Sequence, residues 1–265
     1  MKRLISWALL VVALGMFAAC GDDDNQTLVR QRVLFGTTVG TALLGPSNLV
    51  MLNPTTGAFI RTVGSTGYIV NGLAYDQTTG KLFATTGIND PVFPAGLIEI
   101  NTTTGAGTPI GTGHGLTDTV VSLTVDSAGK LYGWLEPNVD GLVTIDKVTG
   151  FGTLVGVPGL STEKLGLDFD AGGTLWLVDG GGPTYTIDPL TSAATPFGDI
   201  LVDAHHGKFH PTTGLYWGID LADGTIATRN INIVDISTST VLETVPTLDY
   251  LHTISFGFKW VLIST

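Results

Sequence analysis

Short stretches of alternating apolar and polar residues recur along most of the chain. Alternation places apolar side chains on one face of a β-strand, which can then pack into a core. In four repeats such a stretch precedes a turn, at residues 50–52, 98–100, 143–145 and 185–187. After each of five turns, a second short strand ends in an apolar residue followed by Gly or Pro, at residues 63–64, 110–111, 155–156, 197–198 and 245–246. The pattern therefore predicts five β-hairpins.

The five hairpin turns form a repeat. They lie at residues 53–57, 101–105, 146–150, 188–192 and 235–239, and their starts are 48, 45, 42 and 47 residues apart. A strand-rich period of this length predicts a β-propeller. Each turn opens with Asn or Asp, which can bond the backbone two residues on, and three close with a Gly that can be left-handed. Ser192 and Ser239 close the last two turns, which should be strained or differently shaped.

Two further strands precede each hairpin. One carries a Leu and then an aromatic residue, at 34–35, 82–83, 131–132, 175–176 and 215–216. The aromatic column could be a sugar-stacking platform or packing between blades, and its presence in every repeat favours packing. The other, inner strand carries apolar residues two apart, at 73/75, 123/125, 167/169, 207/209 and 254/256.

The order of the strands predicts how the ring closes. The chain enters the repeats with a Leu-aromatic strand at 33–35 and ends with an inner strand at 252–256. We therefore predict an all-β fold: a single propeller over residues 31–265 with five four-stranded blades. The C-terminal inner strand would join the N-terminal strands and remove exposed sheet edges. Residues 260–265 could be a loose end or a sixth Leu-aromatic-type strand.

Residues 72–83 and 98–105 have the pattern Gly-Leu-Ala-Tyr-Asp…Gly-Lys-Leu-Phe followed by Ile-Glu-Ile-Asn-Thr-Thr-Thr-Gly. This resembles YVTN-type and lactonase-like propeller repeats across the whole folded part. The resemblance implies a propeller, and related proteins include lactonases, sugar-binding proteins and bacterial surface proteins. Lactonase-like members usually have more than five blades, which argues against transferring their chemistry.

The N-terminal residues are typical of a secretory signal. Lys2 and Arg3 precede an apolar stretch, residues 4–19, which is short for a membrane span. Cys20 is the only cysteine, and residues 17–20 resemble a bacterial lipobox. The alternatives are a lipoprotein signal peptide over 1–19 with a lipidated Cys20, or a plain secretory signal. The first predicts an acidic flexible tether over 20–30 and a place in the bacterial cell envelope, on the outer membrane at its periplasmic side or surface.

The charge of the chain limits the classes of partner that it is expected to bind. Without Lys2 and Arg3, ten basic residues remain against 23 acidic ones, and no basic run survives. Binding to nucleic acid is not expected, and membrane contact is expected through the lipid anchor only. The predicted partner is a small molecule, a glycan or an envelope protein, and the protein should be a monomer.

One arc of the channel mouth gathers polar residues. These residues lie where loops enter the inner strands, in blades that are consecutive once the ring closes. They are Asn71, Glu163, Asp203, His205 and His252. Such groups could line a wet channel, bind a ligand, or hold a metal through Glu163, Asp203 and His205. Oxygen ligands suit Ca²⁺, and His with carboxylates suits Zn²⁺ or Mn²⁺.

No Gly-x-Ser-x-Gly, His-Glu-x-x-His or phosphate-loop motif occurs. The leading prediction is a non-catalytic binding scaffold. The alternative is a metal-assisted, lactonase- or glycosidase-like hydrolase at the mouth, and a third class is a purely structural envelope protein.

The opposite face of the inner strands predicts an axial column, which consists of Ala74, Thr124, Asp168, Lys208 and Ser255. Asp168 and Lys208 lie at matching heights in adjacent blades, so they are predicted to form an ion pair unless each is separately solvated. His210 occupies a turn position held by Asp in other repeats, and His206 should point away from His205. His114 is expected in a flexible glycine-rich loop.

Overall fold

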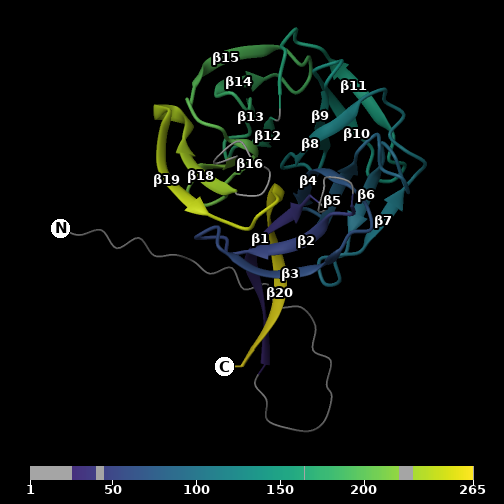
Figure 1. The fold of residues 1–265 in the computed structure, drawn as a ribbon, viewed down its shortest axis with the longest axis vertical. Helices are drawn as coiled ribbons and strands as arrows, with labels where there is room; N and C mark the ends of the chain where they lie inside the picture. Colours follow the sequence, from purple (N-terminus) through teal and green to yellow (C-terminus); the bar gives the residue numbers. More distant parts are fainter. Residues whose placement is uncertain (1–25, 40–44, 164, 221–228, 265) are drawn as a thin grey trace, which may run out of the picture.

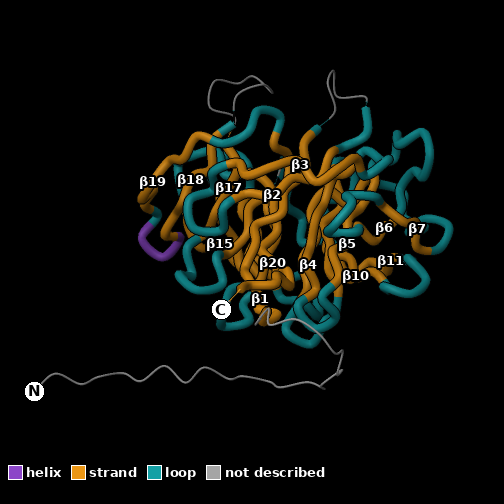
Figure 2. The backbone as a smooth tube through the Cα atoms, turned by 90° about the horizontal axis from the view of Figure 1, so that it is seen from below, coloured by secondary structure: helices purple, strands orange, loops and turns teal. Residues whose placement is uncertain are grey.

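The computed structural model describes residues 26–39, 45–163, 165–220 and 229–264. Five four-stranded antiparallel sheets surround a central axis as the blades of a propeller (Figure 1). Figure 2 shows the ring from its side, where the strands cross the disc between its two faces. The predicted all-β, five-bladed fold is confirmed. Within the described ranges, no helix is long and apolar enough to cross a membrane.

Each blade runs outward from an inner strand. Blade 1 contains β20 (Leu251–Ser264), β1 (Gln26–Thr38), β2 (Asn48–Leu52) and β3 (Phe59–Ser65). Blade 2 contains β4 (Val70–Asp76), β5 (Lys81–Thr86), β6 (Leu97–Ile100) and β7 (Gly107–Ile110). Blade 3 contains β8 (Thr119–Val125), β9 (Leu131–Glu136), β10 (Gly141–Ile145) and β11 (Gly152–Gly156). Blade 4 contains β12 (Gly166–Phe169), β13 (Leu175–Val178), β14 (Pro183–Ile187) and β15 (Ala194–Asp199). Blade 5 contains β16 (His205–Phe209), β17 (Tyr216–Asp220), β18 (Asn230–Asp235) and β19 (Thr240–Pro246), with a 3₁₀ turn η2 (Ile236–Thr238) before β19.

The ring closes as the sequence predicts, but the closing pair is longer. β20 pairs with β1 from Gln26↔Ser264 to Thr38↔Leu251. Residues 26–30, predicted as flexible tether, are therefore strand, and residues 260–264 continue the inner strand instead of forming a sixth Leu-aromatic strand. The reason is that both segments are rich in Thr, Val, Leu and Ile, which favour strands once a partner is present. The predicted signal peptide, Cys20 and residues 21–25 lie outside the described residues.

The core consists of five apolar clusters, each between two neighbouring blades. In blade 1, Leu34 packs against blade 5, whereas Phe35 packs against blade 2 and stacks on Tyr75 with ring centroids 6.2 Å apart. Leu34 and Phe35 are fully buried, and burial of such a side chain contributes roughly 1.5–3 kcal/mol. The aromatic column is thus packing between blades.

Blade 5 departs from the predicted column by one residue. Tyr216 pairs with Phe209 and packs toward blade 4, and Trp217 pairs with Lys208 and packs toward blade 1. In blade 5 the Leu position of the repeat is therefore held by Tyr216 and the aromatic position by Trp217. The sequence predicted Leu215 and Tyr216 there. The turn that begins at His210 has the same length as the one in blade 2, so the strand starts one residue later than predicted.

The repeated glycine at the end of three outer strands has a packing reason. A Cβ added at Gly64, Gly111 or Gly156 would collide with the backbone carbonyl of a turn in the next blade. The partners are the carbonyls of Thr104, Thr149 and Thr191, which lie in the hairpin turns of blades 2, 3 and 4. Glycine therefore allows neighbouring blades to touch backbone to backbone at the rim of the disc.

Ser192 and Ser239 close their turns with φ of 66° and 53°, in the left-handed region, and the second turn contains η2. The expected strain and altered shape are confirmed. Ser192 is also buried, and its hydroxyl has no hydrogen-bond partner among the described residues.

Replacement of Ser192 by glycine should therefore raise the free energy of unfolding by about 1 kcal/mol. The change removes the strain of a left-handed non-glycine residue and the buried hydroxyl without a hydrogen bond. Urea denaturation measures this change. The reverse substitution Gly150→Ser, at the same turn position of blade 3, should lower stability. No gain in the first variant together with no loss in the second would contradict the strain argument.

Candidate functional site

A cavity of about 410 Å³ lies on the propeller axis, where the inner strands end. Its walls include all five residues of the predicted axial column and the turns that follow β4, β8, β12 and β16. We call this cavity the exit funnel. It lies at the opposite end of the inner strands from the arc predicted at the channel mouth.

Lys208 spans the floor of the exit funnel. From β16 its Nζ donates to the carbonyl oxygens of Leu123 on β8 and Leu167 on β12, the second at 2.6 Å. The same nitrogen lies 3.7 Å from Oδ1 of Asp168. An ammonium group has three donors; the two carbonyls take one each, and Asp168 faces the charge as an ion pair. One buried side chain thus connects three inner strands.

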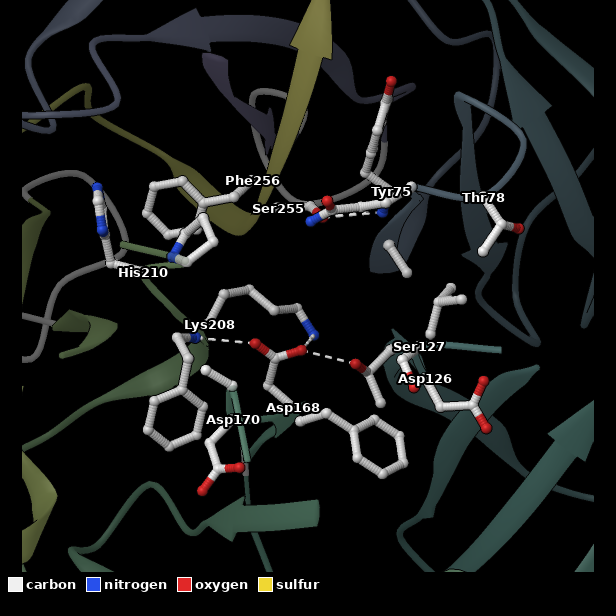
Figure 3. A pocket seen from close by; sticks show the side chains of 18 residues that line it. Tyr75, Thr78, Asp126, Ser127, Asp168, Asp170, Lys208, His210, Ser255 and Phe256 are labelled. Carbon is white, nitrogen blue, oxygen red and sulfur yellow. Dashed lines mark hydrogen bonds and ion pairs between the residues drawn. The ribbon is translucent and has the colours of Figure 1, made fainter. Parts of the chain in front are cut away.

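Asp168 accepts hydrogen bonds at both of its carboxylate oxygens. Its Oδ1 accepts from the hydroxyl of Thr124 at 2.6 Å, and its Oδ2 accepts from the backbone N–H of Phe209 at 2.8 Å. Burial raises the pKa of Asp168 and lowers that of Lys208, and each partner opposes the effect on the other. Both groups are therefore held inside the protein at the base of the funnel, where Figure 3 shows Lys208 and Asp168 facing each other.

The rim combines aromatic and acidic groups. Tyr75, Phe169 and Phe209 line the funnel together with Asp126 and Asp170. Backbone N–H groups of the turns bond Oδ1 of both carboxylates. Neither carboxylate forms an ion pair within the described residues. With the Asp168–Lys208 pair neutral overall, the charged groups on the rim favour a cation.

His210 has the structural role that its position predicts. Its Nδ1 accepts from the backbone N–H groups of Thr212 and Thr213, as aspartate oxygens do in the other turns. Its ring packs on Phe256 with centroids 4.9 Å apart. A neutral imidazole therefore replaces a carboxylate on this side of the rim.

At the channel mouth, part of the predicted arc comes together around a residue that sequence reasoning missed. Oδ1 of Asp179 accepts from the backbone N–H of Glu163 at 2.8 Å. Burial raises the pKa of Asp179, and the charge of Glu163 adds to this while His205 opposes it. Nε2 of the buried His205 lies 3.7 Å from Oδ1 of Asp203. Asp179 follows β13 in a Gly-rich turn, and alternation along the inner strands gives no signal for it.

The other two predicted members of the arc, Asn71 and His252, have contacts with residues of blade 2. Nδ1 of His252 lies 3.0 Å from the carbonyl of Val70, and its ring is 4.7 Å from that of His206. Asn71 lies beside Gly87. Burial lowers the pKa of His252 to about 4.

The predicted metal site is not assembled. Among the described residues, no group of three or more His, Cys, Asp or Glu side chains could hold a metal ion, and this includes Glu163, Asp203 and His205. The predicted arc rests on alternation within strands, but Glu163 and Asp203 lie on non-strand backbone before β12 and β16, where alternation does not apply.

The loop at His114 is packed, not the flexible loop that the sequence predicts. Its backbone N–H donates to the carbonyl of Ala95 at 2.7 Å, and its carbonyl accepts from Gly152 at 2.8 Å. The side chain is buried, Nδ1 accepts from the backbone N–H of Leu116, and burial lowers the pKa of His114 to about 4. Composition alone could not show that two blades enclose this loop.

No protein-family model and no curated protein matches the sequence. A chain from a crystal structure of a nidogen/laminin complex is similar in structure, with a TM-score of 0.58, 13% identity, and coverage of 86% of this chain and 98% of that chain. TolB from Acinetobacter baumannii gives a TM-score of 0.50 and 15% identity, covering 82% of this chain and 53% of that chain. This chain therefore spans about half of TolB. These likenesses support a β-propeller fold.

Proposed function

We propose that the protein is a non-catalytic binding scaffold of the bacterial cell envelope, anchored by lipid at Cys20. Its exit funnel would bind a cationic group, such as an Arg or Lys side chain of an envelope protein. The observation that carries the proposal is the axial cavity of about 410 Å³, which is lined by aromatic residues and by Asp126 and Asp170. The metal-assisted hydrolase has no assembled ligand set among the described residues, so we do not propose it.

The chemistry of the exit funnel suits a cation in two ways. Aromatic rings can attract a guanidinium or ammonium group, and Phe169 and Phe209 line the exit funnel. Oδ2 of Asp170 also accepts from Nε1 of Trp176 at 2.9 Å, but both rim carboxylates keep further acceptor capacity, and a charge-assisted hydrogen bond is stronger than a neutral one. The chain has a formal charge of −11, which would also steer basic partners toward it.

Triarginine is a suitable probe, with triglutamate as the oppositely charged control. In isothermal titration the protein should bind triarginine but not triglutamate. The double variant Asp126→Asn, Asp170→Asn should bind about tenfold more weakly or worse, because it loses two charge-assisted contacts. Asparagine keeps an oxygen that can accept the turn bonds, so the fold should be retained.

Glu99→Gln with Glu243→Gln is the matched control, since it removes the same charge from the outer surface of blades 2 and 5. Its affinity should equal that of the unmodified protein. Equal losses in the two double variants would reduce the effect to net charge and refute a funnel site. Absence of triarginine binding would refute the proposed ligand class.

A further inference from the structure

The strands that close the ring continue past their blade as a two-stranded ribbon. Residues 26–32 of β1 pair with residues 258–264 of β20, and β2 does not accompany them. Figure 1 shows this pair projecting from the ring, with the C-terminus at its tip. We call this segment the terminal ribbon.

One face of the terminal ribbon is apolar and open to solvent. Leu28 lies opposite Leu262, and Arg30 lies opposite Trp260, so these four side chains share a face. Leu28, Trp260 and Leu262 are 59%, 64% and 62% exposed. Isolated exposed apolar residues are ordinary, but a contiguous group on a projecting element marks an interaction surface.

The terminal ribbon is also basic in an acidic protein. Arg30, Arg32 and Lys259 lie on it, and residues 26–33 and 257–264 contain no Asp or Glu. The guanidinium carbon of Arg30 lies 3.9 Å from the ring centroid of Phe258, which holds this cation beside the apolar residues. The basic residues come from both ends of the chain, so no run in the sequence reveals them.

We propose that the terminal ribbon docks on an anionic lipid bilayer. Trp260 and the two leucines would enter the interface, because Trp favours the headgroup level and apolar side chains insert below it. Arg30 and Arg32, which lie on the same face as Trp260, would contact lipid phosphates, which attract basic segments near the surface. The membrane is therefore contacted through protein as well as through the predicted lipid.

The position of Cys20 agrees with this arrangement. Gln26 at the tip follows Cys20 by six residues, which span at most ~20 Å when fully extended. A lipid on Cys20 would hold the terminal ribbon close to the bilayer. Only this point rests on the proposed lipid anchor, since the exposed face and its charge belong to the described residues.

Vesicle co-sedimentation tests the inference without the lipid. Every strand of the ring lies within residues 26–264, so a chain of residues 21–265 keeps the whole fold. It should bind vesicles of equal parts phosphatidylcholine and phosphatidylglycerol, bind pure phosphatidylcholine more weakly, and lose binding as salt rises. Trp260→Ser with Leu262→Ser should lower the partition coefficient about tenfold or more.

Val148→Ser with Leu190→Ser is the matched control, because these residues are 85% and 79% exposed on hairpin turns of blades 3 and 4. This control should bind like the unmodified chain, and so should Asp126→Asn with Asp170→Asn, which separates this test from that of the exit funnel. Absence of binding to the anionic vesicles, or unchanged binding by the ribbon variant, would overturn the proposal. A dimer in light scattering that the ribbon variant abolishes would instead show that a second copy covers this face.

Discussion

Replacement of Lys208 by methionine should lower the free energy of unfolding by about 3–5 kcal/mol at pH 7, the usual cost of removing one partner of a buried ion pair. The ammonium connects the carbonyls of Leu123 and Leu167 and faces Asp168. Methionine fills similar space but leaves the two carbonyls without their hydrogen-bond donor and the buried carboxylate without its counter-charge. Urea denaturation measures the loss.

A double-mutant cycle with Asp168→Asn separates the charge from the packing. Asparagine removes the charge, so the double variant should be more stable than Lys208→Met alone. Without Lys208, only hydrogen bonds such as those from Thr124 and Phe209 would oppose burial, and the pKa of Asp168 would rise further, so Lys208→Met should be less harmful at pH 5, where the carboxyl is more protonated. A loss below about 1 kcal/mol at pH 7 would show that each group is separately solvated, as exposed pairs are.

Acidification from pH 7 to pH 5 should destabilise the protein through His114 and His252. Burial holds the pKa of each at about 4 in the folded protein, against about 6.5 when unfolded. The unfolded chain therefore takes up protons first, and the stability present above pH 6.5 is lost as pH falls toward 4. By pH 5 each of the two histidines should lower the free energy of unfolding by about 2 kcal/mol.

His114→Asn isolates one of the two contributions. Its side-chain oxygen can accept from the backbone N–H of Leu116 in place of Nδ1, and it does not titrate near neutral pH. The variant should lose about 2 kcal/mol less than the unmodified protein between pH 7 and pH 5. An identical loss in both proteins would mean that His114 is not buried in neutral form.

The fold was predictable because its signals are local and repeated. Turn residues such as Asn53 and Gly57 determine each hairpin from within a few positions, and five copies reinforce the same period. The axial column was predictable for a related reason, since alternation holds below the bulges of the inner strands. Asp168 and Lys208 consequently lie together where alternation places them.

The features that could not be predicted depend on strand pairing between distant segments and on irregular backbone. Glu163 and Asp203 of the predicted arc lie on irregular backbone before β12 and β16, where alternation does not place side chains. The terminal ribbon needs Leu28 and Leu262, more than two hundred positions apart, to meet. The cavity at the ends of the inner strands depends on how turns such as the one at Asp126 surround the axis. No local sequence pattern carries this information.

The most direct test of a ligand site in the exit funnel places a reporter at its rim. Residues 21–265 contain no cysteine, so Ser127→Cys provides one labelling site in the funnel and Val148→Cys one on the outer surface of blade 3. Triarginine should produce a saturable fluorescence change from a dye at position 127 and none from the same dye at position 148. Equal responses at the two positions, or no response at position 127, would contradict the account.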